Sequence, residues 1–234
     1  MASAAKPAPG SDLLLELRDG IEVERLRATL RAFGAGGYEE SLAWLRRASG
    51  GELDLGIASH RGALLTWLRA WGCRHLRVAD TERSSEALAA WWERHGGDFP
   101  SATRSIADLT DRELDAAAGA YGALAPARAA TRRRGSGRTT VSFGETAASK
   151  ALFAIRPLAF PPWDAPMRAS LGLSGRGGHG YRSYLEQAAS ALRGLARRLG
   201  VPVSGLPTLL GRPGSSPPKL IDEYLWVRTR DGTR

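Results

Sequence analysis

Glycines divide the chain into short amphipathic segments, and within each segment apolar residues recur at the spacing of an α-helix. The longest and clearest of these segments is residues 181–199. No segment shows an alternation of apolar and polar residues strong enough to indicate a sheet. The sequence therefore predicts an all-α, multi-helix bundle. The predicted helices are residues 12–33, 38–48, 59–71, 84–95, 110–121, 144–155 and 181–199 and a short helix from Asp164 onward, while residues 219–227 are ordered without an assigned type.

After a flexible tail at residues 1–10, the chain is expected to form two closely packed helical parts. Residues 11–125 make the first part and residues 126–234 the second. The boundary falls at residues 126–138, a basic stretch with glycine and serine that is typical of a loop. A chain of 234 residues, 43% of them hydrophobic, is long enough to bury a core of this size.

The two parts differ in charge. Residues 1–125 carry 15 basic and 18 acidic side chains, a net −3, and residues 126–234 carry 18 basic and 6 acidic side chains, a net +12. Of the 33 basic residues only Lys6, Lys150 and Lys219 are lysines, a preference for arginine that is typical of GC-rich bacterial genomes. The uneven distribution still favours a polyanionic partner, most commonly nucleic acid, for the second part. A solvated, arginine-rich surface is the alternative interpretation.

Several classes of protein do not fit the sequence. No apolar run approaches the roughly 20 residues that cross a bilayer, and residues 1–10 lack the apolar region of a secretory signal, so we expect a cytoplasmic protein without membrane contact. A single cysteine, Cys73, excludes a disulfide framework and a four-cysteine iron–sulfur cluster. Isolated histidines argue against a zinc site. Residues 175–180, GRGGHG, follow no strand and are interpreted as a mobile loop, not a dinucleotide site. We expect no metal and no cofactor.

Residues 141–171, VSFGETAASKALFAIRPLAFPPWDAPMRASL, contain the most informative pattern. A helix that begins at Gly144 is followed by a proline-rich turn and by Asp164 at the start of the next helix. The N–H groups at a helix N-terminus opened by glycine can hold a DNA phosphate. The helix and the turn would then place the carboxylate of Asp164 beside the anchored DNA backbone. The alternative is that Asp164 is only an N-cap that accepts backbone hydrogen bonds.

This pattern resembles the signature of the helix-hairpin-helix DNA glycosylases, the endonuclease III-like superfamily. That signature is a hairpin of the type L-P-G-V-G-x-x-T-A, followed by an aspartate about twenty residues after the second glycine. Gly144 matches the second glycine, Ala147 and Ala148 stand in the place of T-A, and Asp164 lies 20 residues after Gly144. Residues 140–143 replace L-P-G-V, so the first hairpin glycine is missing. The resemblance covers about 30 of the 234 residues.

The resemblance implies an enzyme that acts on double-stranded DNA containing a damaged or modified base. Such an enzyme extrudes the nucleotide into a pocket, where Phe160, Trp163 or a tryptophan of the N-terminal helices would stack on the base or replace it. Asp164 would be the catalytic residue, stabilising positive charge on the sugar and orienting the attacking water. Family members that also cleave the strand carry a lysine immediately before T-A, where this chain has Thr146. The resemblance therefore implies a monofunctional, hydrolytic glycosylase, with Lys150 one helical turn too deep to form a Schiff base.

The same resemblance implies a phosphate-binding face around the hairpin. Glu145 would be a partner of the helix dipole or, alternatively, a second acid in the pocket. Lys150 would be a phosphate contact or a surface lysine. The expected DNA-binding residues are Arg132, Arg133, Arg134, Arg138, Gly144, Thr146, Lys150 and Arg168.

Two other functions stay open: a non-catalytic DNA-binding module that keeps the hairpin, and a helical interaction protein whose arginines reflect base composition alone. The excised base, whether alkylated, deaminated or hypermodified, is also open, as is the choice between DNA repair and defence against phages. We expect a monomer.

Overall fold

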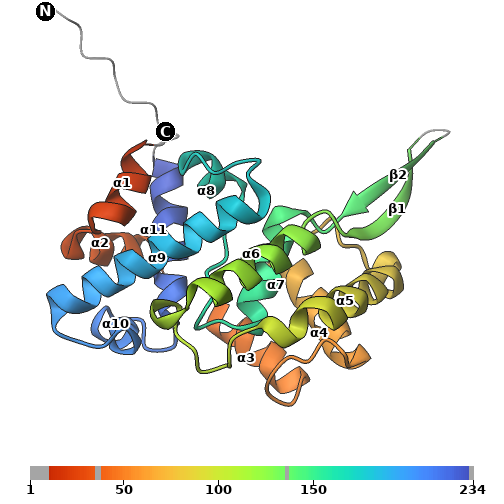
Figure 1. Cartoon of the computed structure of the whole chain (residues 1–234), viewed down its shortest axis with the longest axis horizontal. Helices are drawn as coiled ribbons and strands as arrows, with labels where there is room; N and C mark the ends of the chain where they lie inside the picture. The colour runs from red at the N-terminus through yellow and green to blue at the C-terminus, as the bar shows by residue number, and fades with distance from the viewer. Residues whose placement is uncertain (1–10, 35–37, 135–136, 232–234) are drawn as a thin grey trace, which may run out of the picture.

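The computed structural model describes residues 11–34, 38–134 and 137–231, which are mostly helical (Figure 1). The expected tail, residues 1–10, lies outside the described residues. None of the described helices combines the length and the apolar character needed to cross a membrane. The elements are α1 (Ser11–Asp19), α2 (Val23–Phe33), α3 (Tyr38–Ala48), α4 (Ala58–Ala70), α5 (Thr81–His95), α6 (Asp111–Leu124), β1 (Arg128–Arg134), β2 (Gly137–Ser142), α7 (Gly144–Ile155), α8 (Ala165–Ser170), α9 (Gly177–Leu199), α10 (Leu206–Leu209) and α11 (Pro217–Asp231), with single 3₁₀ turns at Val78–Asp80, Gly96–Asp98, Ile106–Asp108 and Val203–Gly205.

The mostly helical class is confirmed, and local signals explain several helix ends. Thr110 and Glu113 form a capping box at the start of α6, with the Glu113 N–H 3.3 Å from Thr110 Oγ1 and the Thr110 N–H 2.8 Å from Glu113 Oε2. The single helix predicted over residues 12–33 is in fact two helices, because Gly20, with φ +114°, turns the chain between α1 and α2. Residues 219–227 belong to α11.

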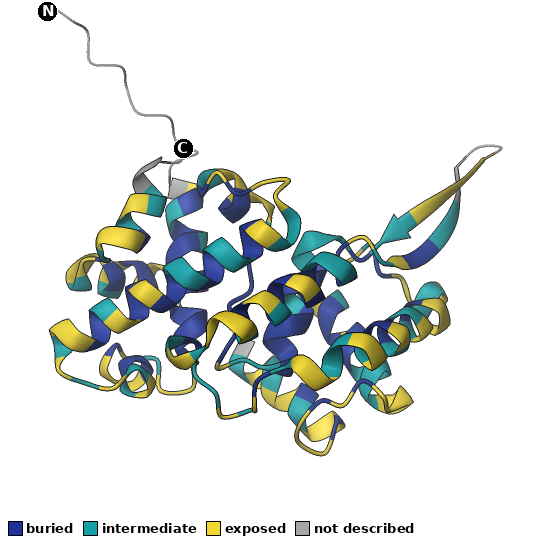
Figure 2. Ribbon diagram, in the orientation of Figure 1, coloured by how far each residue is buried: buried dark blue, intermediate teal, exposed yellow. Residues whose placement is uncertain are grey.

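The helices form two groups that share one hydrophobic core (Figures 1 and 2). In one group α1 and α2 pack against α9 and α11, and α8 and α10 pack against α11. In the other group α7 packs against α4 and α6, with α3 and α5 beside α4. Contacts between α6 and α9 join the groups. The packing thus does not follow the expected boundary at residue 125, and the first helices of the chain lie against the last.

Residues 126–138, expected to be a loop, instead contribute most of a β-hairpin that projects from the helices (Figure 1). Strands β1 and β2 are antiparallel, with Thr131 opposite Thr140 and Arg132 opposite Thr139. The first four residues of β2 are solvent-exposed. A strand without a buried face needs no apolar–polar alternation, which is why the sequence pattern did not reveal it.

The hairpin is inserted between α6 and α7. The Phe143 N–H donates to the Ala127 carbonyl at 3.0 Å, and the Gly144 N–H donates to the Ala125 carbonyl at 2.8 Å. These bonds hold the end of α6 beside the start of α7. Gly144 has φ +76°, a conformation that favours glycine. The compact turn expected before Gly144 by resemblance is therefore replaced by a strand, and one N–H expected to bind phosphate is used within the protein.

The predicted mobile loop at residues 175–180 is wrong for residues 177–180, which form the first turn of α9. Gly178 lies where α9 crosses α6, and a Cβ atom at this position would approach the Ala118 carbonyl oxygen to 2.6 Å. The glycines of this motif therefore allow two helices to approach closely, a packing role that needs no ligand.

Candidate functional site

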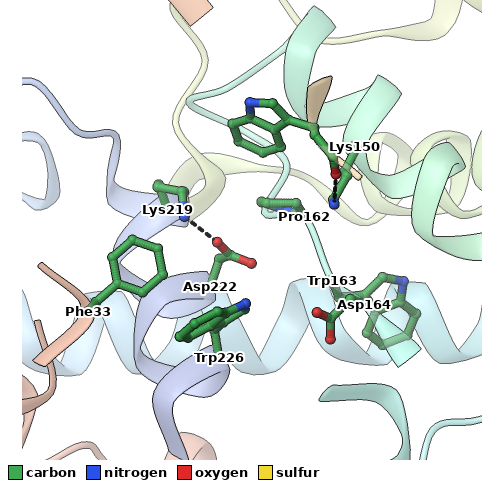
Figure 3. A pocket seen from close by; sticks show the side chains of 9 residues that line it. Phe33, Lys150, Pro162, Trp163, Asp164, Lys219, Asp222 and Trp226 are labelled. Atoms are coloured by element: carbon green, nitrogen blue, oxygen red, sulfur yellow. Dashed lines mark hydrogen bonds and ion pairs between the residues drawn. The ribbon is translucent and has the colours of Figure 1, made fainter. Parts of the chain in front are cut away.

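One cavity of about 180 Å³ opens where the two groups of helices meet (Figure 3). Its walls combine aromatic rings with two lysines and two aspartates from distant parts of the chain. They come from the end of α2, the residue after α4, the middle of α7, the α7–α8 connection and α11. The lining residues are Phe33, Trp71, Lys150, Pro162, Trp163, Asp164, Lys219, Asp222 and Trp226.

Asp164 lines this cavity and is also the N-cap of α8. Its Oδ1 accepts a hydrogen bond from the Met167 N–H at 3.2 Å, and Pro166 occupies the permitted position in the first turn. In Figure 3 the carboxylate points into the cavity, across from Lys219. The capping interpretation and the site interpretation of Asp164 are thus compatible, because the cap uses one oxygen of the carboxylate.

The connection that carries Asp164 is fixed by hydrogen bonds to its backbone. The Ser149 hydroxyl donates to the Trp163 carbonyl at 2.9 Å and accepts from the Trp163 N–H at 3.2 Å. The Tyr181 hydroxyl donates to the Pro161 carbonyl at 3.3 Å, and the Tyr184 hydroxyl donates to the Pro162 carbonyl at 3.2 Å. All three hydroxyl-bearing residues are buried. The position of the carboxylate is therefore set by α7 and α9.

Lys150, expected as a phosphate contact or a surface lysine, is half-buried and lines the cavity. Its Nζ donates to the Trp71 carbonyl at 2.5 Å and lies 5.7 Å from the centre of the Trp71 ring. Although the sequence placed Lys150 one helical turn too deep to form a Schiff base, α7 presents it to the same cavity as Asp164.

Lys219 and Asp222, one turn apart on α11, form an ion pair at the cavity wall, with 2.5 Å between Nζ and Oδ2. Burial raises the pKa of Asp222, and the positive charges of Lys219 and Lys150 oppose that rise. Glu223, fully buried beside them, lies 3.7 Å from Lys219 Nζ and 2.8 Å from a guanidinium nitrogen of Arg212. Burial is also the main cause that raises the pKa of Glu223. This buried charge network anchors α11 behind the cavity.

Lys219 and Asp222 were missed from the sequence, although one signal pointed to the lysine. Two of the three lysines in an otherwise arginine-based chain, Lys150 and Lys219, line one cavity, and the third, Lys6, lies outside the described residues. Lysine offers a compact ammonium group whose proton affinity responds to burial, whereas arginine stays protonated.

The aromatic walls are of two kinds. Phe33 and Trp226 meet edge to face, with ring centres 5.2 Å apart, and both are half-buried. Trp163 is nearly fully buried, stacks parallel on Tyr184 at 4.8 Å and donates its indole N–H to the Tyr121 hydroxyl at 3.1 Å. Trp163, expected as a stacking residue, therefore forms the floor of the cavity, and one face of its ring is already stacked on Tyr184.

Phe160, the other expected pocket residue, does not line the cavity. It is fully buried, and its ring centre lies 5.7 Å from that of Phe99 in the core. Phe160 was expected in the pocket because it is close to Asp164 in sequence. The Ala159 N–H and the Phe160 N–H both donate to the Arg156 carbonyl, and the turn that they form directs Phe160 into the core. Trp71, from the N-terminal part of the chain, lines the cavity where Phe160 was expected.

The expected phosphate-binding residues at the start of α7 lie around a second, more open cavity of about 360 Å³. Gly144, Thr146 and Arg168 all line it, together with Glu145. Arg168 is 7% exposed and forms an ion pair with Glu145 at 3.0 Å, so its charge is already compensated. Glu145 thus has a partner on α8 and does not line the first cavity.

The expected arginines of residues 126–138 lie on the β-hairpin. Arg132, which pairs with Thr139 in the hairpin, donates to the His75 carbonyl and lies 3.7 Å from Asp80. Arg138, on β2, is exposed. Arg133 and Arg134 belong to β1, but their side chains lie outside the description.

Comparison with family models, curated protein sequences and solved structures finds no match to this chain. Within residues 11–34, 38–134 and 137–231, no group of three or more histidine, cysteine, aspartate or glutamate side chains is suited to hold a metal ion. The chemistry of the site must therefore be argued from its own residues.

Proposed function

We propose that this protein is a DNA glycosylase that extrudes a damaged or modified base and removes it by hydrolysis, with Asp164 as the catalytic residue. The observation that carries the proposal is the position of the Asp164 carboxylate: it opens into a cavity whose other walls are aromatic rings and two lysines. This combination suits a flat, polar ring held next to a centre of developing positive charge.

The size and chemistry of the cavity support a single base as its ligand. A volume of about 180 Å³ is below the roughly 300–1,000 Å³ that is typical of pockets for drug-sized ligands. Phe33, Trp71 and Trp226 offer apolar ring surface beside a bound base, and the lysines and aspartates offer donors and acceptors for its edge.

In the proposed reaction Asp164 acts on the sugar. As the bond between C1′ and the base nitrogen breaks, positive charge develops on the sugar, and a fixed carboxylate stabilises it. A water molecule oriented by the same carboxylate adds its hydroxyl group to C1′, and its remaining proton replaces the one that the departing base acquires. The products are an abasic site and the free base.

The experiment that tests this function is the exposure of duplex DNA from several sources, including phages with modified cytosines, to the pure protein. Alkali then cleaves the DNA at abasic sites. We expect breaks at positions of a specific base, which a non-catalytic DNA-binding module or a helical interaction protein would not produce.

The exposed arginines of the hairpin are proposed to contact DNA phosphates. Replacement of both Arg128 and Arg138 by alanine should lower the slope of log affinity against log salt by about 1 for each lost phosphate contact. The measurement is fluorescence anisotropy of a labelled duplex between low and moderate salt. Arg47 and Arg112, exposed on α3 and α6, provide the matched control pair. An equal loss of slope in both pairs would contradict a specific role of the hairpin.

A second candidate is a glycosylase that also cleaves the strand, favoured by the presence of Lys150 and Lys219 at the cavity. An uncharged lysine amine would bond to C1′ as the base departs with one amine proton. The C1′–O4′ bond then breaks, O4′ takes the second amine proton, and the resulting imine is reduced by borohydride to a stable protein–DNA adduct. We expect no adduct, because each Nζ is held as a donor, to the Trp71 carbonyl or to Asp222. An adduct that disappears in Lys150→Gln or Lys219→Gln would establish the second candidate and identify its nucleophile.

A further inference from the structure

The Lys219–Asp222 pair has no part in the charge stabilisation assigned to Asp164. In Figure 3 the two carboxylates belong to different walls: Asp164 lies beside Trp163, and Asp222 lies beside Lys219 and Trp226. One Asp222 oxygen contacts Lys219, while the other points toward the side where Asp164 lies. A ring bound between these walls would have the sugar-directed acid on one side and the ion pair on the other.

The aromatic faces of the cavity already carry the protein's own cations. Lys219 Nζ lies 4.6 Å from the ring centre of Phe33 and 5.9 Å from that of Trp71. Lys150 Nζ lies 5.7 Å from the Trp71 ring. The face of Trp226 is covered by the Arg230 guanidinium at 3.3 Å. Electron-rich rings attract a cationic ligand, but here that attraction is already satisfied. A positive charge on a bound base would lie near these two ammonium groups, because the Asp222 carboxylate is paired with Lys219 and the Asp164 carboxylate belongs to the other wall.

Damaged bases fall into two classes, cationic and neutral, which differ in whether an acid must protonate the departing base. A base alkylated at a ring nitrogen that bears no hydrogen is itself a cation and leaves the sugar as a neutral molecule without help. A neutral base leaves as an anion unless a proton reaches it as the bond breaks, so its excision requires an acid. A carboxyl group and an ammonium group that share a proton at the far wall of the cavity meet this requirement.

We propose that the Lys219–Asp222 pair is the acid that protonates the departing base, and that the site therefore takes neutral bases and rejects cationic, N-alkylated ones. This inference rests on the proposed glycosylase function and narrows its substrate class. The electron pair of the C1′–N bond passes to the base, which takes a proton from the pair. Water delivers hydroxide to C1′, and its other proton, released through Asp164, restores the pair through solvent. No other reactant is needed.

The first test compares the wild-type protein on duplexes that carry one modified base each. The cationic set is 7-methylguanine and 3-methyladenine, and the neutral set is 8-oxoguanine, uracil, hypoxanthine and 5-hydroxymethylcytosine. We expect measurable release of at least one neutral base and none of either cationic base. Faster release of a cationic base than of every neutral one would overturn the inference while leaving the glycosylase function intact. Release of no base from these duplexes or from modified phage DNA would contradict the proposed function itself.

The second test measures discrimination without catalysis. Quenching of tryptophan fluorescence reports ligands in the cavity, since Trp71, Trp163 and Trp226 line it. Guanosine and the neutral 1-methylguanosine are compared with the cationic 7-methylguanosine. We expect the cation to bind at least about 10-fold more weakly than both neutral nucleosides, which corresponds to about 1.4 kcal/mol. Equal or tighter binding of the cation would overturn the inference even if no activity is found.

The third test examines the acid directly. The double variant Lys219→Gln, Asp222→Asn keeps a hydrogen-bonded pair of the same shape but carries no acidic proton of comparable strength, and it leaves no single buried charge at these two positions. Release of the neutral substrate base should fall by about 10²- to 10⁴-fold, with a smaller fall for a fluorinated analogue that leaves more readily. Asp115→Asn, an exposed aspartate of α6, is the matched control. An equal loss for both leaving groups would indicate a structural role and contradict the proposal.

Discussion

Replacement of Asp164 by asparagine is expected to reduce base release by roughly 100-fold or more while duplex DNA still binds. The amide has nearly the shape of the carboxylate but no negative charge to stabilise the sugar cation. It keeps an oxygen that can accept the Met167 N–H, so the cap of α8 is retained and the free energy of unfolding should change by less than about 1 kcal/mol. Removal of a negative charge should leave DNA affinity unchanged or raise it. Single-turnover release of the base and anisotropy of a labelled duplex measure the two effects.

The matched control is Asp108→Asn, since Asp108 is an exposed aspartate remote from the cavity lining. It should leave both base release and binding unchanged. Unfolding of Asp164→Asn, or full activity in a folded variant, would show instead that the carboxylate acts only as a helix cap.

The second large effect concerns stability. Arg212→Met removes the guanidinium that lies 2.8 Å from the fully buried Glu223, and the remaining partner, Lys219, is 3.7 Å away. Removal of the main partner of a buried carboxylate typically lowers the free energy of unfolding by about 3–5 kcal/mol. We expect a loss of this size in the free energy of unfolding at pH 7, measured with urea.

The loss should depend on pH in a defined direction. Burial raises the pKa of Glu223 above 4.5, and the loss of Arg212, which lowers it, should raise it further. The folded state then binds more protons than the unfolded state, so stability falls as pH rises from about 4.5 through the folded pKa. Below that window both states are protonated, and the difference from wild type should shrink.

Arg25→Met is the control for this variant. Arg25 is 47% exposed, and its partner Glu16 keeps a second ion pair with Arg228 at 3.0 Å. Loss of the Arg25 guanidinium should lower the free energy of unfolding by less than about 1 kcal/mol. Equal, small losses in Arg25→Met and Arg212→Met would mean that water reaches Glu223 and that α11 is not anchored by this network.

Most of the helices were predictable because each has a buried stripe, and a stripe leaves a period of three to four residues in the sequence. The short α10 was not predicted, and the residues of α11 were left without an assigned type. The end of α9 before Gly200 and the capping box of α6 follow from local signals of the same kind, whereas the start of α9 at Gly177 was not predicted. The hairpin was not predictable in this way, because Arg138 and Thr139 face solvent and bury no side chain that would leave a pattern.

The residues of the candidate site likewise differ in whether a pattern in the sequence could reveal them. Asp164 and Trp163 were named from the sequence because Asp164 lies 20 residues after Gly144, a spacing that resembles a known signature, and Trp163 is its neighbour. Lys219 and Asp222 were not, because they reach the cavity only through the packing of α11 against α2 and α8, a tertiary contact without a local signal. Phe160 illustrates the reverse: sequence proximity to Asp164 suggested a pocket residue, but a turn of the backbone directs it into the core.

Stabilisation of a cationic sugar by Asp164 is central to the proposed function. The most direct measurement compares the affinity of the protein for two duplexes, one with a pyrrolidine ring in place of the target sugar and one with a tetrahydrofuran ring. The pyrrolidine is protonated and resembles the cation, whereas the tetrahydrofuran is neutral and of the same size. We predict that the wild type binds the pyrrolidine duplex at least ~100-fold more tightly and that Asp164→Asn abolishes this preference. Equal affinity of the wild-type protein for both duplexes would contradict the account.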